Sequence, residues 1–312
     1  MNANSSPLGL STMPNPGGSS YIQPKPAKNI NGMIRILEER GLKITDGERL
    51  RRALFDCNYY RLSGYFRVFQ VDPAHGDNGF RPGTRDVDFL TPYALDSRLR
   101  SIVLKGTARV EVTLRSRFAY LVANDGGAYS YMDPDSYIGG RNAAIRDRLL
   151  DNMGKWLSMS NEVCIRHYRR DDRPIPLWAA VEAMPFDTFS KMLSLHSDTK
   201  ALRALYKSVD LHTSLATSAA IVHSIVYLRN LCSHHSRLWH REMVITPPKV
   251  KEISASFPRI PMMPKSVATS LNTLMYLVDH INDGLEYSSE VRAFLGSDDK
   301  YAEGIIHPLH WE

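Results

Sequence analysis

Hydrophobic residues recur at intervals of three and four along most of the chain, which is the spacing of helices that bury one face. From Lys28 this spacing predicts a helix that ends at Gly41, a residue suited to a helix C-terminus, and a second helix that begins near Thr45. No internal repeat and no sustained strand alternation appears, so the predicted fold class is mainly α, a helical bundle with little or no β. The further helices are predicted over about 92–122, 142–157, 176–196, 213–241 and 266–285, with shorter ones to about 209.

Other stretches depart from the helical pattern. Residues 57–69 are aromatic and basic and fit either a helix or a short strand, and the turn-rich residues 72–84 suit a small irregular hairpin. Residues 160–174 are charged and predict a surface connection. The resulting organisation is a disordered tail over 1–24, an N-terminal helical and irregular extension over 25–90, a helical domain over 91–285 and a C-terminal tail over 286–312.

Composition narrows the class of protein. The chain has 312 residues, 43% hydrophobic and 23% charged, and a formal net charge of +6, which favours acidic partners such as nucleic acid. Three separated cysteines without a disulfide pattern predict a reducing, cytoplasmic location. The N-terminus does not read as a secretory signal. No membrane span is expected, because His223 interrupts the longest apolar run, which is shorter than the roughly 20 residues a span needs.

The candidate catalytic residues are Arg229, Asn230 and His234, in which a histidine follows an arginine by five positions. On a helical wheel Asn230 lies one turn before His234, so their side chains can touch, and Arg229 lies at the flank of the apolar face. His235 lies beside that face and is expected to be a core or boundary histidine. The spacing also arises by chance among 11 histidines, so the alternative from periodicity alone is a set of ordinary polar residues on a solvated helix face.

Four segments resemble, in the same order, the Abi-like (abortive infection, AbiD/AbiF-type) family of bacterial proteins. The resemblance covers about residues 24–310, and RNLCSH within its last segment resembles the Arg-Asn-x-x-x-His signature of HEPN domains, a helical fold that includes many metal-independent RNases. The four segments are NYYRLSGYFRVF, LDSRLRSIVLKGTARVEVTLRSRFAYLV, IPLWAAVEAMPFDTFSKML and YLRNLCSHHSRLWHRE.

The resemblance implies an endoribonuclease of phage defence that cleaves RNA through the RNA's own 2′-hydroxyl and needs no metal or other cofactor. His234 is the implied general acid or base, because histidine titrates near neutral pH, and Arg229 would hold the scissile phosphate. Asn230 would orient His234 or donate to the phosphate. Because one chain supplies one Arg and His set, the resemblance implies a homodimer whose two sets share a cleft. A small non-coding RNA antitoxin is an implied partner.

Basic and aromatic residues elsewhere predict RNA contacts. The expected RNA-binding residues are Arg61, Arg109, Arg115, Arg117 and Arg237, with solvated surface arginines as the alternative. Glu111 is expected to pair with one of these arginines or with Arg229, and a catalytic role for it is the less favoured alternative. The residues around Arg61, namely Tyr59, Tyr60, Tyr65 and Phe66, resemble a surface for stacking bases, although core packing is the favoured interpretation.

Two alternatives to the nuclease remain at this point. One is a non-catalytic RNA-binding or regulatory module bound to a small structured RNA, and the other is a scaffold that senses a phage protein through the loops at 72–91 and 125–140. Metal binding is disfavoured, because the histidine spacings match no closed set of ligands. The histidines concerned are His234, His235, His240, His307 and His310.

Overall fold

The computed structural model describes residues 26–125, 127–257, 260–261 and 263–309, so the tail predicted over 1–24 lies outside the described residues. The described chain is mainly helical, which confirms the predicted fold class. Its helices are α1 (Ile30–Glu39), α2 (Gly47–Cys57), α3 (Tyr59–Phe66), α4 (Val87–Asn124), α5 (Ala143–Met159), α6 (Val163–Arg170), α7 (Leu177–Ala183), α8 (Phe186–Leu195), α9 (Thr199–Lys207), α10 (Leu215–Ser233), α11 (Lys251–Ser256), α12 (Val267–Asn282), α13 (Glu286–Leu295) and α14 (Asp299–Ile306). Strands β1 (Gln70–Asp72) and β2 (Asp77–Phe80) pair in an antiparallel hairpin with an irregular register.

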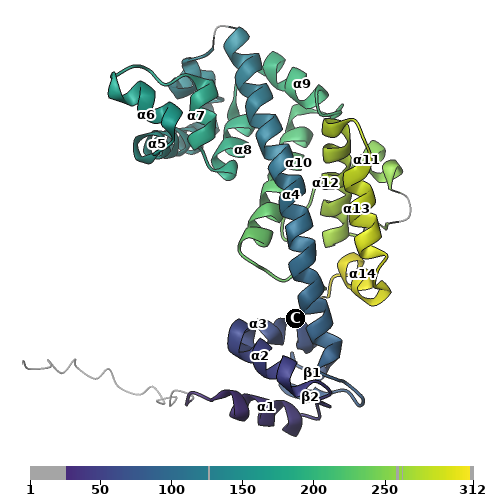
Figure 1. Ribbon diagram of the computed structural model, residues 1–312. Coiled ribbons are helices and arrows are strands. Elements are labelled where there is room, and N and C mark those ends of the chain that lie inside the picture. Colours follow the sequence, from purple (N-terminus) through teal and green to yellow (C-terminus); the bar gives the residue numbers. More distant parts are fainter. Residues whose placement is uncertain (1–25, 126, 258–259, 262, 310–312) are drawn as a thin grey trace, which may run out of the picture.

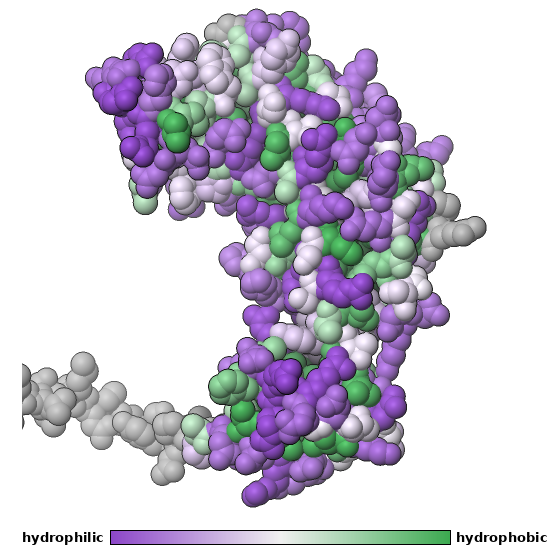
Figure 2. Space-filling view, viewed as in Figure 1, coloured by the Kyte–Doolittle hydropathy of each residue, from purple (hydrophilic) through white to green (hydrophobic). Residues whose placement is uncertain are grey.

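Helix α4 is the structural axis of the molecule. It has 38 residues, and at 1.5 Å per residue it is roughly 57 Å long. Helices α1–α3 and the hairpin gather at its N-terminal end, α5–α7 lie near its C-terminal end, and α10 and α12 pack along its length (Figure 1). The two ends project on the same side of the molecule, and the space-filling view shows a broad hollow between them (Figure 2).

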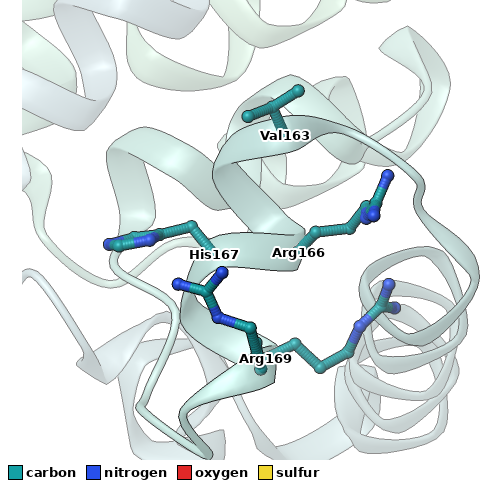
Figure 3. A pocket seen from close by; sticks show the side chains of 5 residues that line it. Val163, Arg166, His167 and Arg169 are labelled. Atoms are coloured by element: carbon teal, nitrogen blue, oxygen red, sulfur yellow. The ribbon is translucent and has the colours of Figure 1, made fainter.

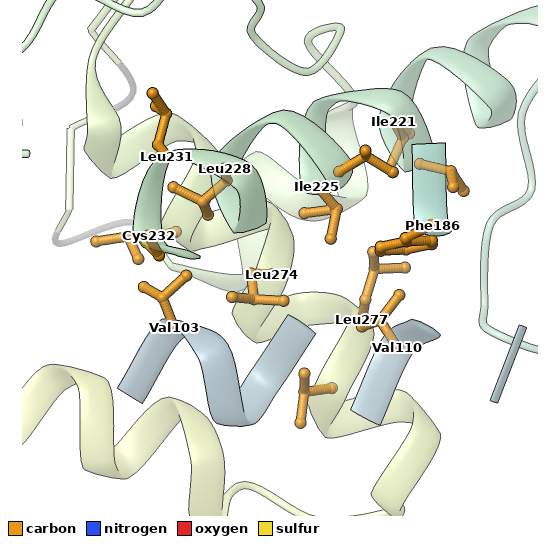
Figure 4. Packing of buried hydrophobic residues seen from close by; sticks show 14 of the residues in the cluster. Val103, Val110, Phe186, Ile221, Ile225, Leu228, Leu231, Cys232, Leu274 and Leu277 are labelled. Carbon is orange, nitrogen blue, oxygen red and sulfur yellow. The ribbon is translucent and has the colours of Figure 1, made fainter. Parts of the chain in front are cut away.

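The core lies where α4, α8, α10 and α12 meet. Side chains from all four helices interlock there, and each fully buried aliphatic side chain stabilises the fold by about 1.5–3 kcal/mol (Figure 4). The labelled members of this cluster are Val103, Val110, Phe186, Ile221, Ile225, Leu228, Leu231, Cys232, Leu274 and Leu277, and all are buried.

Among the described residues, α10 is the one helix whose length and composition would also suit a membrane span. Its most apolar window has a mean hydropathy of 1.2, and half of that window is buried inside the protein. The buried half packs against α4, α8, α9 and α12, and the core helix of a soluble protein satisfies the same criterion. The absence of a membrane span therefore stays a prediction.

Several element boundaries differ from the sequence predictions. The predicted surface connection at 160–174 contains α6, and the predicted C-terminal tail contains α13 and α14, which pack on α4 and α12. The boundary predicted after residue 90 falls inside the first turns of α4. Residues 57–69 are helical except for Asn58, which separates α2 from α3. The small irregular hairpin is confirmed as β1 and β2. Short 3₁₀ turns complete the described chain: η1 (Arg67–Phe69), η2 (Ser130–Met132), η3 (Pro134–Ser136) and η4 (Gly140–Asn142).

Candidate functional site

Helix α10 carries the candidate residues at its C-terminal end. It begins at a cap, where the Ser214 side chain accepts a hydrogen bond from the Thr217 backbone, and it ends eight residues earlier than predicted. His235 adopts a left-handed backbone with φ +53°, and the Ser236 amide donates to the Leu231 carbonyl, which is a Schellman ending. Glycine usually occupies the left-handed position, so the sequence carried no clear signal for this stop.

This ending decides where the two adjacent histidines lie. His234 is the C-cap residue of α10 and is exposed, with its amide 3.0 Å from the Asn230 carbonyl oxygen. His235 is also exposed, so its expected place in the core or at its boundary is wrong. The expectation assumed that α10 continued, whereas the left-handed turn takes His235 off the helix wheel.

Arg229 is held by one hydrogen bond and one ion pair. Its Nη1 donates to Asn230 Oδ1 at 3.0 Å, and its Nη2 lies 3.7 Å from Oε2 of Glu111 on α4. About a third of the surface of this side chain is exposed. The predicted pairing of Glu111 with arginines is confirmed, because Glu111 also binds Arg115. The Asn230 side chain thus engages Arg229, a partner that the helical wheel did not indicate.

Arg115 does not suit its predicted role in RNA binding. It is buried, and its guanidinium donates to the carbonyl oxygens of Val181 (2.7 Å) and Met184 (2.6 Å) as well as to Glu111. These bonds join α4 to the end of α7, and Glu111 pairs with both Arg115 and Arg229. The expectation is corrected because a buried, occupied guanidinium offers nothing to a phosphate backbone.

The turn after α10 is fixed from two sides. Arg61 of α3 donates to the His235 carbonyl at 2.5 Å, and Arg100 of α4 donates to the Ser236 carbonyl at 3.3 Å. Beyond them, the Asp96 carboxylate of α4 accepts bonds from the amides of Leu238 (2.7 Å) and Trp239 (3.2 Å). His234 therefore precedes a turn whose backbone is anchored to two helices.

Asp96 is the centre of this anchor, and sequence reasoning missed it. The residue is fully buried, and it accepts hydrogen bonds from the hydroxyls of Tyr65 and Tyr301, both at 2.6 Å. Burial raises the pKa of Asp96, although hydrogen bonds from the two tyrosines act in the opposite direction. In the sequence, the signal for a buried Asp96 is its position three residues before Leu99 and seven before Val103, which places a carboxylate on the apolar face of α4.

The other predicted RNA-binding arginines separate into two groups. Arg61 is exposed beside the turn after α10, and Arg237 lies close to Gly64 of α3 and donates to the Trp239 carbonyl at 2.7 Å. Burial lowers the pKa of Arg237. Arg109 is exposed and donates to Asn282 at 2.7 Å, and Arg117 is partly exposed and donates to Ser208, so these two bind α12 and the end of α9 instead.

The aromatic residues around Arg61 divide between core and surface. Tyr65 and Phe66 are buried, as the favoured core interpretation predicted, and Tyr59 accepts a bond from Arg40 at 2.8 Å. Tyr60 is 80% exposed. Of the four aromatic residues in the predicted stacking surface, Tyr60 is the one with a mostly exposed ring.

No group of three His, Cys, Asp or Glu side chains that would hold a metal ion occurs in the part of the chain that the structure describes. His240 instead contacts the His307 carbonyl at 2.9 Å through Nδ1, and His310 lies outside the described residues.

The fold and the site define a mainly helical protein in which Arg229, Asn230 and His234 occupy the exposed end of a core helix. The chain belongs to the Abi-like protein family, whose pattern matches residues 52–240, from α2 through the turn after α10. Membership of this family indicates a role in abortive infection, a form of phage defence. No curated protein and no solved structure matches the chain.

Proposed function

We propose that this protein is a metal-independent endoribonuclease of HEPN type that acts as a toxin in abortive infection. The observation that carries the proposal is the arrangement at the end of α10, where Asn230 and Glu111 hold a partly exposed Arg229 and His234 is exposed one turn after Asn230. A fixed cation that holds the phosphate and an accessible proton carrier are two of the groups that phosphodiester cleavage through the 2′-hydroxyl uses.

The chemistry follows from these side chains. A general base removes the proton of the RNA 2′-hydroxyl, and the oxygen attacks the adjacent phosphorus as the bond to the 5′-oxygen breaks. A general acid protonates the leaving oxygen, so the products are a 2′,3′-cyclic phosphate and a 5′-hydroxyl. His234 carries one of these protons, and Arg229 stabilises the charge on the phosphate oxygens. Asn230 positions Arg229 by accepting a hydrogen bond from its guanidinium, and Glu111 positions it through an ion pair at 3.7 Å.

The scheme needs a base and an acid, and each chain contributes one histidine at the position of the Arg-Asn-x-x-x-His signature. We infer a homodimer in which a second copy completes the cleft. A groove of about 420 Å³ between α4 and α7 supports this inference, because Tyr120 and Trp178 line it and are 68% and 49% exposed. The groove is linked to the site through packing contacts, since Val181 lines it and accepts a bond from Arg115, which binds Glu111. Exposed aromatic side chains are enriched in protein interfaces.

The substrate in this proposal is cellular RNA in the cytoplasm, and a small structured RNA restrains the toxin until infection. The net charge of +6 agrees with an RNA partner.

The test is induction of the wild type, Arg229→Ala, His234→Ala and His235→Asn in a bacterial host, followed by sequencing of RNA 5′-hydroxyl ends. Asparagine tolerates the left-handed backbone of residue 235, so His235→Asn is the matched control. We expect growth arrest and new ends from the wild type and from His235→Asn, and neither from the other two variants. If the wild type binds RNA yet forms no new ends, the nuclease proposal fails and a non-catalytic RNA-binding module takes its place.

A further inference from the structure

Helix α6 presents a basic face that the candidate site does not use. Ile165 is fully buried and Cys164 and Tyr168 are partly buried, so this side of the short helix packs on the core. The opposite side carries Val163, Arg166, His167 and Arg170, which follow the i, i+3, i+4, i+7 spacing of one helix face and are all exposed. Figure 2 shows the corresponding end of the molecule as strongly hydrophilic.

These side chains surround an open hollow. Its volume is about 570 Å³, and its lining is Val163, Arg166, His167, Arg169 and Arg170. Figure 3 shows Arg166, His167 and Arg169 extending from α6 around this space. Cavities for small organic ligands are mostly apolar, whereas Val163 is the one apolar residue in this lining. The lining therefore suits an anion that accepts several hydrogen bonds.

The arginines that line the hollow are only partly paired with groups of the protein itself. Arg169 caps the end of α5, where it donates to the carbonyls of Leu157 (3.1 Å) and Ser160 (2.8 Å). Asp171 is shared between Arg170 at 3.3 Å and Arg173 at 2.7 Å. The Arg166 side chain has no hydrogen bond or ion pair with any residue that the structure describes, whereas its backbone amide donates to the Glu162 carbonyl at 2.9 Å.

The stability of α6 does not account for this arrangement. Basic residues in the last turn of a helix are favoured by its dipole, which explains Arg169 and Arg170. Arg166 lies one turn earlier, and its position four residues before Arg170 makes a like-charge pair that destabilises a helix. An anion between the two guanidinium groups removes that repulsion.

We propose that the hollow on α6 binds the phosphate backbone of RNA, at a surface separate from the end of α10. The ligand is a polyanion because several arginines line one recess, and arginine forks match phosphate oxygens. A recess fits a single strand or a loop of RNA better than the flat surface of a membrane. This inference rests on the proposed function for the choice of RNA, and it adds a second contact that holds the substrate or the restraining RNA.

The test measures how RNA binding depends on salt. The probe is a fluorescent 2′-O-methyl RNA of mixed sequence, which the proposed chemistry cannot cleave because its 2′-hydroxyl is blocked. The variant is Arg166→Gln with Arg170→Gln, both at exposed positions, and the control is Arg35→Gln with Arg203→Gln. The control removes the same charge from exposed positions on α1 and α9, where the arginine side chains have no partner among the described residues.

We expect the slope of log affinity against log salt concentration to become shallower by about 1.4 in the α6 variant, since each single-strand phosphate contact contributes roughly 0.7. Its binding is weaker than that of the wild type at low salt, and the difference shrinks as salt rises. The control keeps the wild-type slope. An unchanged slope and affinity in the α6 variant overturns the inference.

Two further outcomes separate this inference from its alternatives. If the α6 variant keeps the wild-type RNA slope but no longer binds vesicles of phosphatidylglycerol and phosphatidylcholine, the surface binds lipid and the inference is overturned. If the wild type forms no new RNA ends in cells while the α6 variant still shows the shallower slope, the nuclease proposal fails and this inference stands.

Discussion

Arg229 of α10 and Arg115 of α4 share one carboxylate, that of Glu111, with Arg229 Nη2 3.7 Å from Glu111 Oε2. The two arginines differ in burial, since the Arg115 side chain is 10% exposed and that of Arg229 is 34% exposed. Glu111 thus joins a structural arginine to the candidate phosphate-binding arginine. The Glu111 carboxylate therefore supports both the packing of α4 against α7 and the position of Arg229.

Replacement of Glu111 by glutamine removes that charge and keeps the shape. We expect Glu111→Gln to lower the free energy of unfolding by about 1–3 kcal/mol, because Arg115 is left buried without its counter-charge. The matched control is Glu290→Gln, which breaks the exposed pair with Lys105 and is expected to cost less than about 1 kcal/mol. Urea denaturation of the three proteins measures the difference. Equal losses in the two variants would show that Arg115 does not depend on Glu111.

Asp96 carries the second prediction, which concerns stability. Its two carboxylate oxygens accept from Tyr65, Tyr301, Leu238 and Trp239, and an amide at this position turns one acceptor into a donor that faces other donors. We expect Asp96→Asn to lower the free energy of unfolding by roughly 2–4 kcal/mol. Tyr301→Phe removes one hydrogen bond and is expected to cost about 1 kcal/mol. A loss in Asp96→Asn no larger than in Tyr301→Phe would contradict the role of Asp96 as the centre of the anchor.

The loss of stability expected in Asp96→Asn depends on pH. Burial raises the pKa of Asp96 above its unfolded value, so the folded protein binds the proton more tightly. The contribution of the Asp96 carboxyl to stability is fully present below its pKa in the unfolded chain. It is lost as the pH rises through its pKa in the folded protein. Since asparagine does not titrate, we expect the difference between wild type and Asp96→Asn to shrink from about pH 4 upward. A difference that grows with pH would mean that the hydrogen bonds outweigh burial in setting the pKa.

Much of the fold was predictable because it depends on the spacing of apolar residues. The three- and four-residue repeats of α4, α5 and α12 mark faces that are buried, and their predicted bounds lie within five residues of the observed ones. Helix α6 was missed because charged residues dominate its exposed face. Helices α13 and α14 were missed because each is short and follows polar turn residues.

The role of the candidate site residues stays a prediction, and the geometry around them was only partly predictable. The RNLCSH segment indicated Arg229, Asn230 and His234, and the pairing of Glu111 with arginines followed from opposite charges. The Schellman ending at His235 and the buried Asp96 were not predictable, because each depends on contacts between segments far apart in sequence. Burial of Arg115 is of the same kind, since carbonyls at the end of α7 hold it.

Cys232 carries the third prediction, which tests the packing under the site. It is fully buried on α10, and burial raises its pKa to about 12, so the reactive thiolate is scarce at pH 8. Cys57 and Cys164 are only partly buried. We expect a thiol reagent to modify these two in the native protein and Cys232 only after denaturation, as read by mass spectrometry of the labelled peptides. Labelling of native Cys232 at the rate of Cys164 would show that the end of α10 opens readily.

The last prediction concerns the inferred dimer. If the groove between α4 and α7 is the interface, Trp178→Glu places a charge among apolar contacts and separates the copies. We expect light scattering to show a monomer and RNA cleavage to fall by roughly 10²-fold, which is the contribution of one general acid or base. Trp156→Glu is the matched control, because Trp156 is similarly exposed but lies on α5 outside the groove, and it should remain dimeric and active. A wild type that cleaves RNA as a monomer would exclude the composite cleft, and both protons would then have to pass through a single chain.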